Sequence, residues 1–332
     1  MSMRTVGIVG AGQLARMMAQ AAIPLDIGIV LLAADEQDGA AQVVPDVIVG
    51  SPDDPECLAA LADRCDVMTF DHELVDPVIL AGLEAEGHVV WPSSTSMALA
   101  QNKRRQRREL GEAGFRMPAW TAIDSIVDIE TFAGDVGWPI MLKASSGGYD
   151  GRGVWSVADR DAARTVVAGA EATATVLLAE ERLELELELA VLVARAPSGE
   201  IAIYPATETV QRDGICRELR VPCRLDSSLI QEAEDTARAI AESIGIVGVM
   251  AVEFFVADGS LIINELAPRP HNSGHWTIEG ATTSQFEQHL RAVLDLPLGN
   301  TSPVAPGIAT VNLLGRGEVH DPRARLAHGL SV

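Results

Sequence analysis

The sequence predicts an α/β fold that opens with a parallel sheet. Four short apolar runs in the first hundred residues are separated by amphipathic segments, the pattern of alternating buried strands and helices. The runs are TVGIVG (5–10), IGIVLL (27–32), DVIVG (46–50) and CDVMTF (65–70), and QLARMMAQAA (13–22) is the first helix. This order is typical of a Rossmann-like βαβ domain.

A second, mixed part follows the parallel sheet. Residues 93–115 are expected to be helical, and FRMPAW (115–120) is expected to be a linker. Beyond it strands alternate with helices, and the last two strands flank Ala-Asp-Gly, a hairpin signal. The expected strands are 139–144, 176–180, 188–195, 248–256 and 260–266, and the expected helices are 159–170 and 228–244. The chain therefore combines α/β with α+β patterns.

Composition excludes several classes of partner. The 332 residues include 47 acidic and 25 basic side chains, a formal net charge of −22. This charge repels nucleic acid and anionic membranes, so neither is expected as a partner. The cysteines form no CxxC pair and indicate neither zinc nor a redox motif. No apolar run is long enough to cross a bilayer and no signal peptide opens the chain, which predicts a cytoplasmic protein.

The first glycine-rich loop, GIVGAGQLAR (7–16), lies between a predicted strand and a predicted helix. Its glycines and Ala15 approximate a dinucleotide-binding fingerprint, but the only acidic residue that closes the second predicted strand, IVLLAAD, is Asp35. The loop supports a helix N-terminus whose N–H groups face an anion. A ligand phosphate is the favoured occupant, with NAD and a purely structural turn as alternatives.

A second glycine-rich loop, SSGGYDGRG (145–153), follows Lys143. Its glycines let the backbone approach a polyphosphate and form an anion nest, although their order differs from the Walker motif. Lys103 and Lys143 are the only two lysines beside 23 arginines. Lysine supplies a compact charge where arginine supplies a planar fork. Both lysines are therefore predicted to contact phosphate, with chance survival on a solvated face as the alternative.

Two carboxylates, Glu253 and Glu265, lie on the strands of the predicted hairpin, each among apolar neighbours. A three-residue loop with Gly259 left-handed would put both on one face, whereas a two-residue Asp-Gly turn would put them on opposite faces. On one face they would supply the hard oxygen ligands that Mg²⁺ prefers. An ordinary solvated pair is the alternative reading.

A polar loop, ELAPRPHNSGHWT (265–277), follows directly. Its prolines and glycine predict a rigid loop, and loops of this kind often carry chemistry. A zinc site from His271 and His275 fits the spacing but lacks a third ligand nearby. The polar residues of the loop are Arg269, His271, Asn272, Ser273 and His275.

At these residues the sequence resembles the ATP-grasp superfamily and, within it, the N5-carboxyaminoimidazole ribonucleotide synthetases of purine biosynthesis. The resemblance covers nearly the whole chain, and PRPHNSGHWTI followed by TSQFEQHLRAV is its most specific part. The related formate-dependent formyltransferase is expected to read closer to PRPHDTG, and biotin carboxylase lacks this loop. Further matching segments are GIVGAGQLARM, TFDHE (69–73), LKASSGGYDGRG (142–153), LAEERL (178–183) and VNLLG (311–315).

The resemblance implies four parts. They are a Rossmann-like domain at 1–102, the small lid subdomain of an ATP-grasp fold at 103–178, the large α+β subdomain with the metal site at 179–300, and the start of an apparently truncated C-terminal segment at 301–332. Relatives generally continue further, with a lysine and an arginine that grip the substrate phosphate. His320, Arg323 and Arg325 are not convincing replacements, so reduced affinity for the ribonucleotide is expected.

The resemblance also implies a reaction. ATP phosphorylates bicarbonate, and the exocyclic amine of 5-aminoimidazole ribonucleotide captures the carboxyphosphate or the CO₂ released from it. ATP, Mg²⁺ and bicarbonate are thus the expected cofactors and co-substrate, and a homodimer is expected because relatives commonly form one. The alternatives are an ATP-grasp ligase for another acyl acceptor, such as a formyltransferase-like enzyme, and a nucleotide-binding protein with little turnover.

Residue roles follow from the matched motifs. Contacts to ATP are implied for Lys103, Lys143, the lid-loop residues Gly148, Tyr149, Asp150, Gly151, Arg152 and Gly153, the hinge residues Glu180, Glu181 and Leu183, and Glu188, Gln211, Asn264 and Glu265. Mg²⁺ ligation is implied for Glu253 and Glu265. The ribonucleotide and the incoming carboxyl group are assigned to Gly12, Gln13, Leu14, Glu73, Tyr149, Asp150, Arg269, His271, Asn272 and Ser273. Of these, Asp150, Arg269, His271, Asn272 and Ser273 are the catalytic candidates, with Arg269 stabilising charge on the transferring groups.

Three departures from the family pattern stand out. Gln211 occupies a position where many relatives carry histidine near the nucleotide. Lys103 occupies a position that is often arginine. The loop HELVD (72–76) lacks the usual proline.

Overall fold

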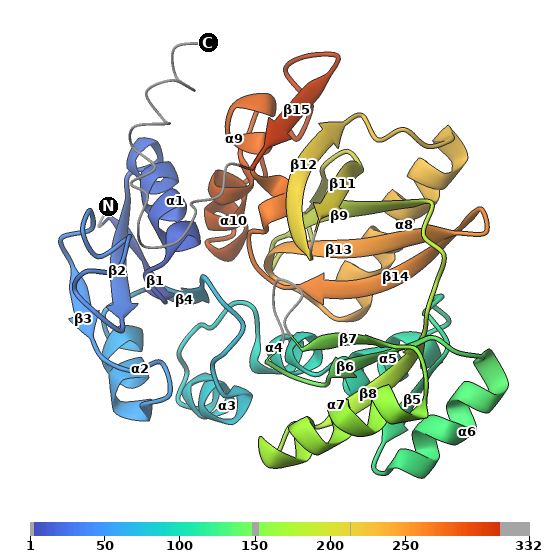
Figure 1. Cartoon of the computed structure of the whole chain (residues 1–332). Helices are drawn as coiled ribbons and strands as arrows, with labels where there is room; N and C mark the ends of the chain where they lie inside the picture. Colours follow the sequence, from blue (N-terminus) through green and yellow to red (C-terminus); the bar gives the residue numbers. More distant parts are fainter. Residues whose placement is uncertain (1–2, 148–152, 213, 313–332) are drawn as a thin grey trace, which may run out of the picture.

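A four-stranded parallel sheet opens the computed structural model, which describes residues 3–147, 153–212 and 214–312 (Figure 1). The strand order is β3-β2-β1-β4, and all neighbours run parallel. The predicted Rossmann-like sheet is therefore confirmed. Its elements are β1 (Arg4–Val9), α1 (Gln13–Ala22), the 3-10 turn η1 (Ile23–Leu25), β2 (Ile27–Ala33), β3 (Val47–Val49), α2 (Pro55–Ala62), β4 (Val67–Phe70) and α3 (Pro77–Ala85).

The helix expected over 93–115 is two helices, α4 (Ser94–Gln101) and α5 (Lys103–Glu112). They break at Asn102, whose extended backbone ends α4 and whose side-chain oxygen accepts the Arg105 N–H at 3.0 Å. Such a cap satisfies one of the free donors at a helix start. The Lys103 N–H then donates to the Ser145 carbonyl at 2.7 Å, which fastens the start of α5 beside the second glycine-rich loop.

The second sheet is small and antiparallel, in the order β5-β8-β6-β7. Helices α6 and α7 cover one face of it (Figure 1). Ile129, Phe132 and Leu142 lie in the core between these helices and the sheet. Its elements are β5 (Trp120–Ile123), α6 (Ile126–Val136), β6 (Ile140–Ala144), β7 (Val154–Val157), α7 (Arg160–Ala172) and β8 (Leu177–Glu181).

The third sheet is the largest, in the order β14-β13-β9-β11-β12-β15 with β10 paired to β9. Helix α8 packs against it through Ala233, Ala237 and Ile240, whose spacing follows the predicted apolar stripe. The elements are β9 (Leu187–Arg195), β10 (Ile201–Ile203), β11 (Thr207–Arg212), β12 (Ile215–Val221), α8 (Ser227–Ser243), β13 (Gly248–Ala257), β14 (Ser260–Ala267), the 3-10 turn η2 (Asn272–Gly274), α9 (Thr277–Gly280), α10 (Gln285–Val293) and β15 (Ile308–Val311).

Helix α10 joins the first and third sheets. It lies beside α1 (Figure 1), and its residues Phe286 and Leu290 share one apolar core with Met18 of α1. Its His289 ring is completely buried, with Nε2 2.7 Å from the Thr69 hydroxyl and Nδ1 accepting the Val249 N–H at 3.0 Å. Burial lowers the pKa of His289 to about 3, so the ring is neutral and donates from Nε2.

Among the described residues, no helix combines the length and the apolar character needed to cross a membrane.

The His289 bridge predicts a specific loss of stability. In His289→Leu the Thr69 hydroxyl and the Val249 N–H lose their buried partner, so the free energy of unfolding should fall by about 2–4 kcal/mol. Urea denaturation measures it. His88→Leu, at a partly exposed histidine, is the control and should change the free energy by less than about 1 kcal/mol. Equal losses in both variants would contradict the bridge.

The same histidine predicts a pH dependence. Its ordinary pKa of 6.5 applies to the unfolded chain and the folded value is about 3, so below pH 6.5 the unfolded state binds the proton first. Stability is therefore expected to decline as pH falls from 6.5 toward 3. This decline should be shallower in His289→Leu when unfolding free energies are compared at several pH values.

Candidate functional site

Strands β13 and β14, which carry Glu253 and Glu265, are joined by the shorter of the two turns considered from the sequence. Asp258 and Gly259 form a two-residue turn, both left-handed with φ of 48° and 65°. In a regular ladder this turn would send the side chains of Glu253 and Glu265 to opposite faces. Of the two turns considered from the sequence, the structure therefore has the two-residue Asp-Gly turn, and Gly259 in it is left-handed.

A β-bulge restores the shared face. The ladder pairs Phe254 with Ile263 and then Glu253 with Glu265, so Asn264 is an extra residue in β14. A bulge of this kind re-aims the following side chains without breaking the strand pair. Glu253 and Glu265 thus lie directly opposite each other, which the turn alone would have prevented.

Both lysines of the chain lie at this pair. Lys103 forms an ion pair with Glu265, and Lys143 Nζ donates to the Asn264 side-chain oxygen at 3.3 Å. The Asn264 amide in turn donates to Glu253 Oε2 at 3.2 Å. The structure therefore gathers two carboxylates, an amide and two ammonium groups from α5, β6 and the hairpin.

The two carboxylates differ in acidity because their neighbours differ. Burial, then the charges of Glu265 and Glu188, raise the pKa of Glu253 to about 8. Burial would also raise the pKa of Glu265, but the ammonium groups of Lys103 and Lys143 lower it below its usual 4.5. At neutral pH, Glu265 is ionised while Glu253 holds a proton for much of the time. An added cation at this pair would favour ionisation of both.

Lys143 is fixed by a buried charge cluster. Its Nζ lies 2.7 Å from Glu180 Oε2, and Arg107 Nε lies 2.7 Å from Glu180 Oε1. Burial would raise the pKa of Glu180, but these two cations lower it to about 2. Burial lowers the pKa of Lys143, and the Glu180 charge opposes that shift. The side chain of Glu180, predicted as a hinge residue that contacts ATP, is thus the counter-ion of Lys143.

Arg107 was missed in the sequence, although a signal was present. It lies four residues after Lys103 on α5, so both side chains leave the same face of the helix. The side chain of Arg107 is completely buried. Its burial and its bond to Glu180 depend on the distance between α5 and β8, which spacing along the chain does not reveal.

The first glycine-rich loop is occupied by a carboxylate. Gly12 N–H donates to Asp71 Oδ2 at 2.7 Å, so this donor at the start of α1 is already bonded. Burial raises the pKa of Asp71, while His72, Gly12 and Arg269 oppose the shift. The prediction of a ligand phosphate at this helix end therefore rests on the N–H groups of Gln13 and Leu14.

Arg269 and Glu73 face each other across the boundary between the first sheet and the polar loop. The Arg269 Nε lies 2.8 Å from Glu73 Oε1, and Arg269 also donates to the Pro270 carbonyl at 3.0 Å. Two residues predicted from separate motifs are thus brought together by the fold. The pair leaves Arg269 part-exposed at the site.

His271 is buried, and its tautomer follows from its contacts. Nδ1 accepts the Ser273 N–H at 3.4 Å and lies 2.8 Å from the Ser273 hydroxyl. Burial and the Arg269 charge lower the pKa of His271 to about 3, so the ring is neutral. Because Nδ1 accepts a hydrogen bond, the single ring proton is on Nε2. Nε2 lies 3.4 Å from Glu253 Oε1. His271 therefore lies beside the acid pair with Ser273 bonded to it, whereas the His275 ring stacks on Phe286.

Some of the remaining predicted residues lie in the described part of the chain, and the others lie outside it. Glu188 is part-buried on β9 and raises the pKa of Glu253, so it lies near the acid pair. Glu181 accepts the Ala119 N–H at 2.7 Å, which occupies its side chain with the linker. Gln211 on β11, Leu183 and Asn272 are each part-buried. Gly148, Tyr149, Asp150, Gly151 and Arg152, together with His320, Arg323 and Arg325, lie outside the described residues.

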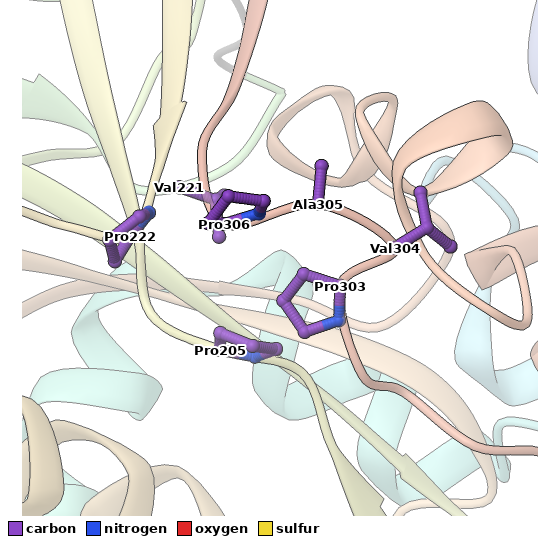
Figure 2. Close-up of a pocket in the computed structure, with 7 residues that line it drawn as sticks. All are labelled: Pro205, Val221, Pro222, Pro303, Val304, Ala305 and Pro306. Carbon is purple, nitrogen blue, oxygen red and sulfur yellow. The ribbon is translucent and has the colours of Figure 1, made fainter.

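A separate cavity of about 440 Å³ lies between β12 and the segment before β15 (Figure 2). Four prolines line it together with Val221, Val304 and Ala305, and no charged side chain does. Such a lining offers nothing to a polyphosphate, so this cavity is not the nucleotide site.

The fold and the paired lysines and carboxylates define an ATP-grasp enzyme. A model of the ATP-grasp domain matches residues 108–286, and a model of the ribonucleotide synthetase preATP-grasp domain matches residues 3–101. The chain belongs to the N5-carboxyaminoimidazole ribonucleotide synthases. It is 50% identical over 319 residues to the synthase of Mycobacterium leprae, covering 93% of this chain and 73% of the relative.

Solved structures agree with this family. The Aspergillus clavatus carboxyaminoimidazole ribonucleotide synthase complexed with ATP matches with a TM-score of 0.90 and 33% identity, covering 99% of this chain and 86% of that one. The synthase of the same organism in complex with ADP and 5-aminoimidazole ribonucleotide matches with a TM-score of 0.88 and 32% identity, again covering 99% and 86%.

The contact between Gly10 and Asp71 predicts a sensitive position. Gly10 has φ of +98°, and an added Cβ would overlap the Asp71 carboxylate. Gly10→Ala should therefore lower the free energy of unfolding by about 2–4 kcal/mol through backbone strain and loss of the Asp71–Gly12 bond. Thermal and urea denaturation measure it. Gly39→Ala, where an added Cβ meets no atom within 4 Å, is the control and should differ little from the wild type.

Proposed function

We infer that the chain catalyses the ATP-dependent carboxylation of 5-aminoimidazole ribonucleotide to N5-carboxyaminoimidazole ribonucleotide in purine biosynthesis. Its relatives carry this activity in their names, and similar structures hold ATP, ADP and the ribonucleotide. The observation that carries the proposal is the direct pairing of Glu253 with Glu265 between Lys103 and Lys143. This arrangement suits a polyphosphate with its counter-cation.

Mg²⁺ is the metal that we propose for this site. Glu253 and Glu265 would hold it, with the Asn264 side-chain oxygen adjacent and with phosphate oxygens and water completing the shell. The raised pKa of Glu253 supports this assignment, because a divalent cation would offset the repulsion between the two carboxylates. When bound, the ion neutralises negative charge on the phosphates. Lys103, which pairs with Glu265 here, would contact the same phosphates.

The proposed reaction has two steps. The γ-phosphoryl group of ATP passes to a bicarbonate oxygen, which gives ADP and carboxyphosphate. The exocyclic amine of the ribonucleotide then attacks the carboxyl carbon, or CO₂ released from it, and phosphate and a proton leave. The Lys143 ammonium, held by Glu180, would neutralise charge on the phosphates in the first step. Arg269, oriented by Glu73, stabilises charge on the carboxyphosphate.

Coupled measurement of ADP release tests the proposal. Release should require bicarbonate and should increase when 5-aminoimidazole ribonucleotide is added. ATP use that is indifferent to both co-substrates would exclude this reaction and leave a ligase for another acceptor. Complete absence of ATP use would favour a nucleotide-binding protein.

We also propose that the protein is a homodimer, as the resemblance implies, and that it is cytoplasmic, as the sequence analysis predicts. Sedimentation equilibrium of the purified chain measures the assembly state directly.

Substitutions in the phosphate and metal groups should separate nucleotide binding from carboxylation. Lys143→Ala and Glu265→Gln are each expected to lower turnover by roughly 100-fold or more, because they remove electrostatic stabilisation of the transferring phosphoryl group. Asn272→Ala should reduce carboxylation more than ADP affinity. Glu186→Gln, at an exposed side chain near the hairpin turn, is the matched control and should keep wild-type turnover. Equal loss of nucleotide affinity in Asn272→Ala would contradict its assignment.

Metal binding should depend on pH. The pKa of Glu253 is about 8, so below that value a bound metal must displace its proton. The affinity for Mg²⁺ in the presence of ADP should rise by up to about tenfold per pH unit from 7 to 8 and level off above. Isothermal titration calorimetry in buffers of different ionisation enthalpy measures both affinity and released protons. In Glu253→Gln the affinity should be lower and nearly independent of pH in this range.

A further inference from the structure

Helix α10 carries two glutamines that are completely buried, Gln285 and Gln288. Buried amides are retained in protein cores only where their donors and acceptors are bonded. Each of these side chains bonds to both main-chain groups of one residue in another segment. The two residues so held are His271, in the predicted catalytic loop, and Gly299, in the segment that follows α10.

Gln285 holds His271 from both sides of its backbone. The His271 N–H donates to Gln285 Oε1 at 2.8 Å, and Gln285 Nε2 donates to the His271 carbonyl at 2.7 Å. The Gln285 N–H donates to the Thr277 hydroxyl at 2.9 Å, and that hydroxyl donates to the Gly274 carbonyl at 2.6 Å. An added Cβ on Gly274 would overlap the Gln285 side chain, so the loop fits closely around it.

The two bonds between the Gln285 side chain and the main chain of His271, here called the clamp, determine where the His271 ring points. With both main-chain groups of His271 bonded, its Cα–Cβ direction is fixed, and the bond between Nδ1 and Ser273 fixes the ring rotation. Nε2 is thereby held 3.4 Å from Glu253 Oε1. A shift of about 1 Å in such a group can cost about 100-fold in rate.

We propose that Gln285 is a positioning residue for the carboxylation step, acting through the backbone of His271. This proposal rests on the proposed function. It concerns the loop that contains His271, which is assigned to the ribonucleotide, and it does not concern the two lysines that are assigned to ATP. Gln285 also lies on the helix that packs against α1 through Phe286 and Leu290. The clamp therefore connects the loop that contains His271 to α10. Through the packing of α10, it also connects that loop to α1, which begins at the first glycine-rich loop.

Gln288 supplies a matched control on the same helix. Its Nε2 donates to the Gly299 carbonyl at 2.9 Å, and the Gly299 N–H donates to its Oε1 at 2.7 Å. The burial, the side chain and the pair of bonds are thus alike in Gln285 and Gln288. The difference is that no predicted site residue lies in the segment held by Gln288.

The test compares Gln285→Met with Gln288→Met in the full chain. Each variant removes one pair of side-chain bonds to the main chain of a single residue, so both should lose a similar amount of thermal stability. Q285M should lower kcat for ribonucleotide-dependent ADP release by about 10- to 100-fold. Its KM for ATP and its affinity for ADP should stay within about twofold of wild type. Q288M should keep kcat within about threefold at a temperature where both variants are folded.

Two outcomes would overturn the proposal. One is an equal fall of kcat in both variants, and the other is a loss of ADP affinity in Q285M that matches its loss of kcat. If Q285M does not fold, Q285E tests the same donor, since only its protonated carboxyl can donate to the His271 carbonyl. Its kcat relative to wild type should then fall as pH rises from 6 to 8, and a constant ratio would contradict the clamp.

A readout without turnover separates this proposal from the proposed function. Ring ¹⁵N signals of His271, assigned with His271→Asn, should shift in Q285M and stay unchanged in Q288M. Unchanged signals in both variants would reject the clamp even in an active enzyme. A wild-type chain that ignores the ribonucleotide would instead reject the proposed function, and the ring signals would still test whether Gln285 positions His271.

Discussion

Two carboxylates set opposite each other are costly unless cations lie beside them, and the rest of the site is arranged around this constraint. The bulge at Asn264 brings Glu253 and Glu265 onto one face of the large sheet. Lys103 and Lys143 approach the pair from α5 and the small sheet. Since no single element supplies both signs of charge, the site exists only where the two ATP-grasp sheets meet.

Two cations of the site, Lys143 and Arg269, are in turn held by carboxylates outside the acid pair. Glu180 lies between Lys143 and Arg107, and Glu73 orients Arg269. Such partners fix a charged side chain in one geometry before the substrate arrives, which is the condition for electrostatic stabilisation of a transferring group. Helix α10 has a comparable role for neutral groups, because its buried amide and imidazole side chains bond to backbone or hydroxyl groups of neighbouring segments.

Much of the fold and some of the site could be predicted from local patterns. Alternating apolar runs identified the four parallel strands, and the rarity of lysine singled out Lys103 and Lys143. The hairpin was predicted, but its turn was left open between two lengths, and the facing of the two carboxylates depends on a bulge at Asn264 that the turn residues do not predict. Arg107 and Asp71 were not predicted as site residues, because their partners are distant in the sequence. Arg107 bonds to Glu180, 73 residues away, and Asp71 bonds to Gly12, 59 residues away.

The sequence by itself determined the classes of element, the supply of charge and the family motifs, since these depend on neighbouring residues and on composition. The tertiary structure decided which groups meet: Glu180 became the counter-ion of Lys143, and Asp71 took the Gly12 N–H at the start of α1. The physical reason is that ion pairs and buried hydrogen bonds act over a few ångströms of space. The number of residues between two groups does not give the distance between them in space. That distance is established only when the sheets and helices pack together.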